Sequence, residues 1–198
     1  MSTLTALALN CTLKPTPEPS STALLASQVL AELEKHDVSG TSLRVVDYDV
    51  KPGVEADMGD GDEWPFIREQ ILAADIIVLA APTWMGQLSS IGMRVMERLD
   101  ADLTTRAFYN KVAVAAVVGN EDGAHQIVSQ LFQAMGDVGF TIPAQGSTYW
   151  NGEAMHKVDY IDLKKTPDST ADATAAVALN AAHLAGVLKD SQYPTPKE

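Results

Sequence analysis

Three short stretches of the chain carry side chains whose chemistry suits one small ligand. Residues 11–22 have hydroxyl groups, one lysine and the start of an expected helix, a combination suited to a phosphate group. Residues 82–86 include a tryptophan and a methionine, which suit the face of a flat apolar ring. Residues 119–123 include two glycines and an asparagine, whose amide and neighbouring backbone N–H groups could bind the carbonyls and nitrogens of a heterocycle. Together they indicate a phosphate joined to a flat heterocycle.

These stretches follow strands in a regular alternation of strands and helices. Apolar runs bounded by polar or turn-forming residues predict strands over residues 4–9, 43–48, 76–81, 112–118 and 140–150. Apolar residues at helical spacing predict helices over residues 25–33, 65–74, 88–99, 127–138 and 173–188. Pro82 is expected to end the third strand, because proline cannot donate to a strand ladder. The pattern predicts an α/β fold, a doubly wound five-stranded parallel sheet, with the three stretches at its ligand-binding carboxyl edge.

The longer segments between these elements are expected to be irregular. Three prolines exclude a regular helix from residues 10–19. Acidic residues and glycines dominate residues 51–63, which are expected to form a solvated surface loop. Residues 151–167 are expected to form a polar loop before the last helix, and residues 192–198 a frayed tail.

Composition narrows the class of protein and its partners. A 46% hydrophobic content suffices for one domain of 198 residues, whereas 14 basic against 26 acidic residues give a net charge of −12. This charge makes nucleic acid and anionic membranes poor partners. The single cysteine, Cys11, and four histidines without ligand spacing predict no metal site and a reducing compartment. Residues 4–9 are too short for a signal peptide and no run reaches membrane-spanning length, so a cytoplasmic protein is expected.

The chain lacks the sequence motifs of other functions that α/β folds of this class carry out. No Gly-x-Gly-x-x-Gly follows the first strand, and no Gly-Lys-Ser/Thr forms a P-loop. A phosphoacceptor domain would need an aspartate at the end of the third strand, where Ala81 and Pro82 stand. No Gly-x-Ser-x-Gly nucleophile elbow occurs.

Residues 81–89, Ala-Pro-Thr-Trp-Met-Gly-Gln-Leu-Ser, are similar to the flavin-ring loop of a known family. From the first strand to about Met155, the chain resembles flavodoxin-like NAD(P)H-dependent FMN reductases and flavin-binding quinone reductases. The resemblance implies a flavodoxin-like sheet, FMN as cofactor and NADH or NADPH as reductant. It implies that FMN is bound by Cys11, Thr12, Lys14, Ser20, Ser21, Thr22, Pro82, Thr83, Trp84, Met85, Gly86, Gly119, Asn120, Glu121, Asp122 and Gly123. The family's first loop usually opens with Gly-Ser and often holds an arginine, whose place Lys14 takes here as a point charge.

Several of these residues have a second interpretation. Trp84 and Met85 could pack beneath their loop instead of against a ligand. Residues 121–122 could form a solvated turn instead of tuning a flavin. Cys11 is expected to be a small packed residue and not a reactive thiol. Trp150 is either an anchor of the edge strand or part of the ligand rim.

The resemblance implies an enzyme in which NADH or NADPH reduces FMN, and the flavin then reduces a small-molecule electron acceptor such as a quinone or a free flavin. Because the cofactor carries this chemistry, no catalytic side chain is expected. The alternative is a flavodoxin-like FMN electron carrier that docks protein redox partners through its acidic surface. A fold relative that has lost its flavin is a third interpretation. Related reductases commonly complete their pocket with a neighbouring chain, which implies a homo-dimer or tetramer with residues 151–167 as a candidate contact.

Overall fold

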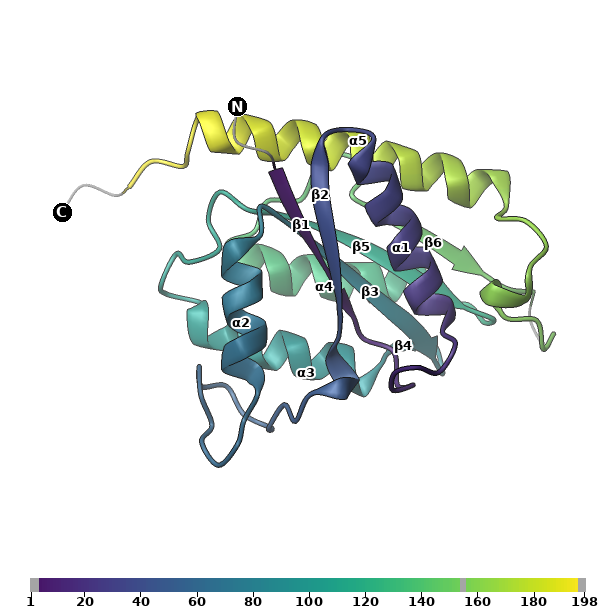
Figure 1. The fold of residues 1–198 in the computed structure, drawn as a ribbon, viewed down its shortest axis with the longest axis horizontal. Coiled ribbons are helices and arrows are strands. Elements are labelled where there is room, and N and C mark those ends of the chain that lie inside the picture. The colour runs from purple at the N-terminus through teal and green to yellow at the C-terminus, as the bar shows by residue number, and fades with distance from the viewer. Residues whose placement is uncertain (1–3, 154–155, 196–198) are drawn as a thin grey trace.

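The fold is built around a parallel sheet with helices on both of its faces (Figure 1). The computed structural model describes residues 4–153 and 156–195. Within these residues the parallel strands are β1 (Leu4–Asn10), β2 (Val38–Arg44), β3 (Ile76–Trp84), β5 (Val112–Gly119) and β6 (Ser147–Asn151). Their order is β2-β1-β3-β5-β6. Counting the parallel strands alone, this is the flavodoxin-like order 2-1-3-4-5, which confirms the predicted fold class.

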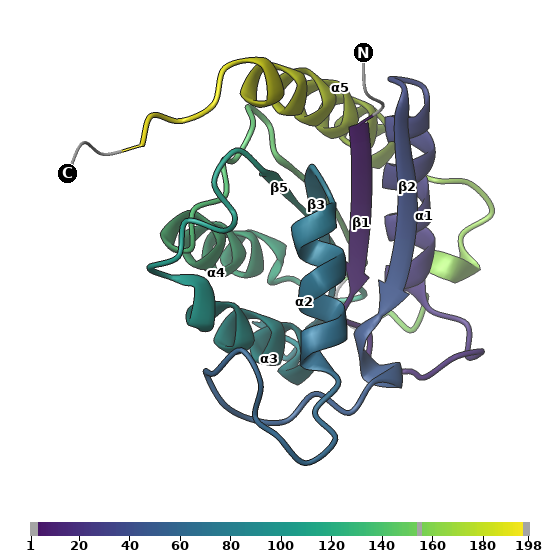
Figure 2. The ribbon, with the colours of Figure 1, turned by 60° about the vertical axis from the view of Figure 1, so that its left-hand side comes forward.

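The helices form two layers, one on each face of the sheet (Figure 2). Helices α1 (Ser21–Glu34) and α5 (Asp168–Asp190) share one apolar core with alternate residues of the central strands. Helices α2 (Trp64–Ala73), α3 (Ser90–Leu99) and α4 (Ala124–Asp137) share a second core with the intervening residues. Because both faces are covered, the central strands are largely apolar, as the sequence indicated.

Helix α5 is long and apolar enough to cross a membrane by length and composition alone. Its inner side, however, packs Val177, Ala181 and Leu188 into the core over the sheet. Figure 1 shows the helix lying along the sheet layer beside α1. It is therefore a core helix and not a membrane span.

The edge strands differ from the sequence prediction. Strand β2 covers Val38–Arg44, not residues 43–48, and the chain then enters a 3-10 helix at Val45–Asp47. The prediction was wrong because β2 pairs only with β1 and its centre is exposed, so it carries no apolar run. Strand β6 is shorter than the predicted residues 140–150, since Pro143 separates it from an isolated bridge at Thr141.

Strand β3 continues past Pro82, which was wrongly expected to end it. Pro82 pairs with Val118 of β5, whereas β1 pairs with β3 only as far as Ala80. Proline has no N–H to donate to a neighbouring strand. Because β1 no longer pairs with β3 at Pro82, no hydrogen bond between β1 and β3 is lost there. Thr83 and Trp84 then pair with the short antiparallel strand β4 (Gln87–Leu88).

A tight hairpin turn joins β3 to β4. Met85 and Gly86 occupy its two central positions with φ values of 51° and 73°, as a two-residue hairpin requires. The residue Leu88 thus belongs to β4, and α3 begins at Ser90 behind the N-cap Ser89, whose Oγ accepts from the N–H of Gly92 at 3.1 Å.

The acidic loop after β2 is exposed over most of its length, as predicted, but a buried ion pair anchors it. Arg98 of α3 is fully buried, and its guanidinium donates to Asp62 Oδ2 at 2.7 Å and to the carbonyls of Lys51 and Glu55. The guanidinium also lies 5.6 Å from the ring centroid of Trp64. The side chain of Arg98 therefore anchors the acidic loop to α3.

Two residues of the segment expected to form a frayed tail contact the rest of the chain. Tyr193 donates its N–H to Asn110 Oδ1 at 2.7 Å, and its hydroxyl lies 3.0 Å from Thr141 Oγ1. Arg106 donates to the carbonyl of Pro194. Residues 193 and 194 of the expected tail thus have hydrogen-bonding partners on the body of the protein, whereas residues 196–198 lie outside the described residues.

Candidate flavin site

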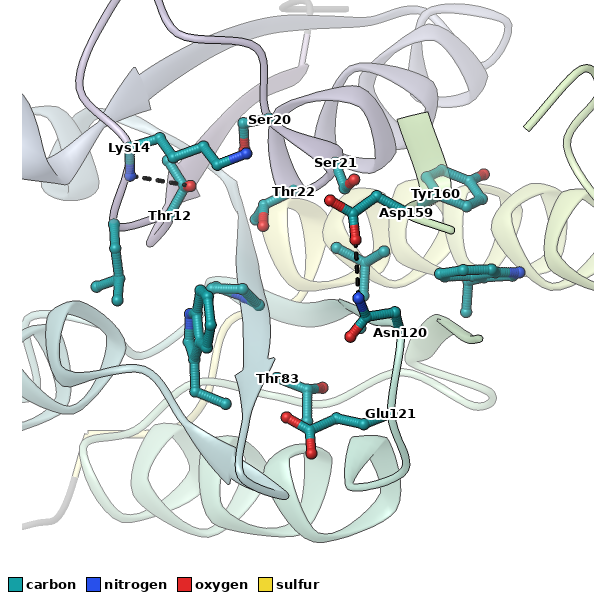
Figure 3. Close-up of a pocket in the computed structure, with 16 residues that line it drawn as sticks. Thr12, Lys14, Ser20, Ser21, Thr22, Thr83, Asn120, Glu121, Asp159 and Tyr160 are labelled. Carbon is teal, nitrogen blue, oxygen red and sulfur yellow. Dashed lines mark hydrogen bonds between the residues drawn. The ribbon is translucent and has the colours of Figure 1, made fainter. Parts of the chain in front are cut away.

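A pocket of about 210 Å³ lies at the carboxyl edge of the sheet (Figure 3). It is lined by Thr12, Leu13, Lys14, Ser20, Ser21, Thr22, Pro82, Thr83, Trp84, Val118, Gly119, Asn120, Glu121, Trp150, Asp159 and Tyr160. All three predicted stretches contribute to it. Its volume is below the roughly 300–1,000 Å³ of pockets that enclose a whole ligand, so a ligand spanning it would be covered only in part.

One end of the pocket is built for an anion. Ser20 caps α1 by accepting the N–H of Ala23 at 3.2 Å, and in the described part of the chain the N–H groups of Ser21 and Thr22 have no protein acceptor. Figure 3 shows the Lys14 side chain extending towards Ser20. A helix N-terminus with free N–H groups, hydroxyls and one cation suits a phosphate dianion.

The loop that carries Lys14 is held in shape by Arg44 at the end of β2. Arg44 Nη1 donates to the carbonyls of Lys14, Pro15 and Glu18 at 3.1, 2.9 and 2.9 Å. Asp47 accepts both the N–H and the hydroxyl of Thr16, and these two hydrogen bonds hold its pKa below the ordinary value. The proline-rich loop, which departs from the family pattern in sequence, is therefore a fixed structure.

Cys11 does not reach the pocket, which corrects its place among the candidate residues. The side chain is 1% exposed and packs in the core under α2 and α3, because it points away from the pocket at the end of β1. Burial raises the pKa of its thiol to about 12, so the thiol is neutral at pH 7. The packed interpretation of Cys11 holds.

The other end of the pocket is formed by the β3–β4 hairpin and by the end of β5. Trp84 is 52% exposed, which excludes a core role and leaves its ring available. Thr83 is 6% exposed, and its Oγ1 is buried with no hydrogen-bond partner among the described residues. A buried hydroxyl without a partner costs free energy unless a ligand supplies one. A side chain would not fit at position 119, since a Cβ added to Gly119 would lie 2.6 Å from Thr83 Cβ.

The hairpin and the loop after β5 form one continuous wall. Glu121 lines the pocket, and its Oε1 accepts the N–H of Met85 at 2.7 Å. Gly123, with a φ of 142°, touches the hairpin so closely that an added Cβ would lie 2.7 Å from the Cα of Gly86. The carboxylate and the two glycines thus hold the two loops together.

Four predicted residues belong to this wall but are not among the residues that line the pocket: Met85, Gly86, Asp122 and Gly123. Met85 is 88% exposed because it stands at the tip of the hairpin. Asp122 turns towards Asn151 and Gly123, so the solvated turn describes Asp122 but not Glu121. These four residues shape the wall and do not face the ligand space.

Three aromatic or acidic residues of the pocket, Trp150, Asp159 and Tyr160, were not among the residues expected to bind FMN. Trp150 belongs to the edge strand β6 and also lines the pocket, with its ring 5.4 Å from the ring of Tyr160. Tyr160 is 2% exposed and donates its hydroxyl to Gln28 at 2.6 Å. Asn120 Nδ2 donates to Asp159 Oδ1 at 3.0 Å. Both Asp159 and Tyr160 come from the irregular segment 151–167, where no periodic signal in the sequence could locate them.

Trp84→Ala is expected to weaken ligand binding and to leave stability nearly unchanged. An aromatic ring contact contributes roughly 0.5–1.5 kcal/mol beyond buried area, so affinity for FMN should fall by roughly threefold to tenfold. The measurement is a fluorescence titration beside a thermal melt. Unchanged affinity would show that the half-exposed ring does not contact the ligand.

The sequence model of one protein family, described as NADPH-dependent FMN reductase, matches residues 4–155. The chain belongs to this FMN reductase family. The match confirms the family inferred from residues 81–89. FMN is the flavin that the family uses, and the groups at both ends of the pocket fit it: free N–H groups and Lys14 for a phosphate, and the unpartnered Thr83 hydroxyl beside Trp84 for a ring with heteroatoms.

Two curated proteins are similar to this FMN reductase family member. The 8-demethyl-8-aminoriboflavin-5'-phosphate synthase of Streptomyces davaonensis is 31% identical over 98% of this chain and 82% of its own length. The divalent metal cation transporter MntH of Mycobacterium bovis is 34% identical over 94% of this chain. This chain spans only 29% of that second relative.

Solved structures show the same arrangement of the fold. RosB with bound 8-demethyl-8-formylriboflavin-5'-phosphate has a TM-score of 0.86 and 31% identity, over 96% of this chain and 82% of RosB. A flavodoxin from the domain Archaea has a TM-score of 0.60 and 13% identity, over 92% of this chain and 99% of its own. The NADH:FMN oxidoreductase EmoB has a TM-score of 0.59 and 17% identity, over 98% of this chain and 92% of its own. The last two share the fold.

Proposed function

We propose that the chain binds FMN in this pocket and passes electrons from NADH or NADPH to a small acceptor such as a quinone or a flavin. The observation that carries the proposal is the joining of an anion-binding end and a ring-binding end in one pocket of an FMN reductase family member. Bound FMN would supply the hydride and electron chemistry. The protein would hold the phosphate at Ser21 and Thr22, and it would position the ring between Trp84 and residues 119–121.

The test is a pair of measurements on the purified protein. FMN is expected to bind at least about a hundredfold more tightly than riboflavin, because charge-assisted hydrogen bonds to the phosphate contribute roughly 1.5–3 kcal/mol each. Under anaerobic conditions NADH or NADPH should then bleach the visible flavin spectrum, and a quinone should restore it. Equal affinity for FMN and riboflavin would contradict the phosphate site. Reduction only by a protein partner would favour the electron-carrier alternative.

A second candidate function is that a flavin phosphate is the substrate and not a resident cofactor. It is favoured by the two matches at 31% identity, a synthase of an aminoriboflavin phosphate and a structure holding a formylriboflavin phosphate, whereas the reductase and flavodoxin structures are 13% to 17% identical. Mass spectrometry of FMN before and after incubation with the protein, NADH or NADPH and a quinone separates the candidates. FMN returned unaltered while the quinone is reduced supports the reductase, and a flavin phosphate altered on its ring supports the second candidate.

Glu121→Gln should raise the midpoint potential of the bound flavin. Glu121 lines the pocket, and its negative charge opposes the charge gained on reduction, whereas glutamine keeps an oxygen that can accept from Met85. The expected rise is roughly 10–30 mV at low salt and smaller at high salt, because the carboxylate is partly exposed. Spectroelectrochemistry measures it, with Asp122→Asn as the matched control outside the pocket lining. An equal shift in both variants would assign the effect to overall charge.

We also propose that the protein is a cytoplasmic homo-dimer or tetramer. Leu13, Trp84 and Met85 expose apolar surface at and beside a pocket that is too small to enclose its ligand, so a neighbouring chain would cover them. Residues 159 and 160 of the segment considered for that contact instead line the pocket of their own chain. Light scattering at micromolar concentration tests the proposal, and a monomer would contradict it.

A further inference from the structure

A second cavity, of about 290 Å³, lies at the amino edge of the sheet, at the opposite end of the strands from the flavin pocket. Asp75 and Lys111 line it directly before β3 and β5, and Lys189 lines it from the last turn of α5. Figure 2 shows α5 passing this end of the sheet beside the start of β1. The polar residues that line this amino-edge cavity are Asp75, Tyr109, Asn110, Lys111, Lys189 and Gln192, and it shares no lining residue with the flavin pocket.

The amino-edge cavity has an excess of positive charge, although the chain as a whole carries −12. Among the described residues, the charged side chains that line it are Lys111, Lys189 and Asp75, so two positive charges face one negative charge. Burial lowers the pKa of Lys111, Asp75 opposes this shift and Lys189 adds to it, so Asp75 does not fully compensate the partly buried ammonium. A ligand with one negative charge would balance the cavity.

The acceptors of Asp75 and Asn110 are engaged by donors of the protein itself. Asp75 Oδ2 accepts the N–H of Thr5 at 2.9 Å, and Lys189 Nζ lies 3.3 Å from both carboxylate oxygens. Asn110 Oδ1 accepts the N–H of Tyr193 at 2.7 Å. Because a backbone N–H can only donate, this hydrogen bond fixes which atom of the Asn110 amide is the oxygen.

Donors on Lys111 and Asn110 are left for a ligand. The Lys111 ammonium has three N–H groups, and it donates to the carbonyls of Leu72 and Ala74 at 2.7 and 2.8 Å. These two contacts cap the carboxyl end of α2 and leave one N–H over. In the part of the chain that the structure describes, that third N–H and the two N–H groups of Asn110 Nδ2 have no protein acceptor. A carboxylate, which only accepts, matches these donors.

The rest of the lining is apolar and can cover the body of a ligand. Leu72, Ala107 and Leu188 line the cavity beside the ring of Tyr109. The volume of about 290 Å³ is many times the roughly 10–15 Å³ that a single water requires. A small inorganic ion would therefore leave these apolar side chains uncovered.

We infer that the amino-edge cavity binds a small organic monocarboxylate. The carboxylate accepts from Lys111 and Asn110, and it balances the extra positive charge of the cavity. The apolar part of the ligand packs against Leu72, Leu188 and the ring of Tyr109. The site lies apart from the flavin pocket, so its failure would leave the proposed function standing.

The test is a calorimetric titration of the purified protein with benzoate, a planar monocarboxylate, in a buffer without phosphate or other carboxylates. Benzamide has the same ring without the charge and serves as the matched ligand. Benzoate is expected to bind at least about tenfold more tightly than benzamide, because hydrogen bonds to a charged acceptor are stronger. Absence of benzoate binding, or equal affinity for the two ligands, overturns the inference.

Asn110→Asp keeps an oxygen for the N–H of Tyr193 but replaces the amide donor with a negative charge. Asparagine and aspartate both tolerate the φ of 67° at this position, so the variant is expected to fold. Its affinity for benzoate should fall by at least about tenfold, because the added charge cancels the excess positive charge. Lys189→Met removes one of the two positive charges and should lower the affinity by about threefold or more.

Lys35→Met is the matched control for Lys189→Met, because it removes the same charge from a side chain that is 64% exposed at the end of α1. It should leave the affinity for benzoate unchanged, and thermal melts check that every variant is folded. Wild-type affinity in Asn110→Asp or in Lys189→Met overturns the inference. Loss of benzoate binding in Lys14→Met and not in Asn110→Asp would place the ligand in the flavin pocket and overturn it as well.

Discussion

Replacing Arg98 with alanine is expected to lower the free energy of unfolding by about 3–5 kcal/mol, the usual cost of breaking a buried ion pair on one side. Arg98 is fully buried and donates to Asp62 and to the carbonyls of Lys51 and Glu55. Its loss would leave the carboxylate, two carbonyls and the ring of Trp64 without their partner. Urea unfolding measures the change.

The pH dependence of the same variant gives a second, independent readout. Burial alone raises the pKa of Asp62, but hydrogen bonds from Arg98 and from the N–H groups of Met58, Lys51 and Trp64 outweigh it and hold that pKa well below its ordinary value near 4. A lowered folded-state pKa adds stability above about pH 4 that is lost as the pH falls further. Arg98→Ala should therefore flatten the loss of stability with acid.

Arg94→Ala is the control for Arg98. Arg94 lies on the same helix and donates to the carbonyl of Val50, but its side chain is 32% exposed, so its loss should cost at most about 1 kcal/mol. A cost for Arg98→Ala as small as that for Arg94→Ala would show that the acidic loop is not held by the buried pair.

Gly123→Ala should disrupt both stability and the flavin site. An L residue is strained at the φ of 142°, and the new Cβ would meet the backbone of Gly86 at 2.7 Å. Strain and overpacking of this kind cost about 2–4 kcal/mol together. Because backbone must move to relieve the contact, the hairpin and the loop after β5 should separate, and affinity for FMN should fall by about tenfold or more.

Gly136→Ala in α4 is the matched control for this variant. Gly136 has no atom within 4 Å of an added Cβ and lies in a helix, where alanine is favoured by about 0.5–1 kcal/mol. It should stabilise the protein slightly and leave FMN binding unchanged. If Gly123→Ala binds FMN as the wild type does, the contact between the two loops is not needed for the site.

The sequence predicts the centre of the fold better than its margins. Strands β1, β3 and β5 are buried on both faces, so their apolar runs mark the first residue of each strand and place its last residue within one to three positions. Strand β2 has a neighbouring strand on one side only, and its central residues are exposed. Its sequence therefore contains no apolar run that would predict a strand. The hairpin after Pro82 was missed because a proline normally ends a strand. Here β3 can continue through Pro82, because its pairing with β1 already ends at Ala80.

The sequence predicted those site residues that directly follow a strand and whose side chains suit the ligand. Thr12, Lys14, residues 20–22, 82–84 and 119–121 all line the pocket, because the carboxyl ends of parallel strands meet at one edge. Asp159 and Tyr160 lie about forty residues beyond the last of these stretches. A long-range hydrogen bond and a ring contact bring them to the pocket, and neither leaves a local trace in the sequence.

Arg44 has a consequence for how quickly a ligand could be captured. Fixing the backbone of one residue costs about 1–2 kcal/mol of conformational entropy, and the loop from Lys14 to Glu18 would have to lose that freedom at the moment of binding if it were loose. The three carbonyls held by Arg44 mean that the loss occurs when the protein folds. Arrival of a phosphate is then a docking step without a rearrangement of this loop, and its rate is set by diffusion and orientation.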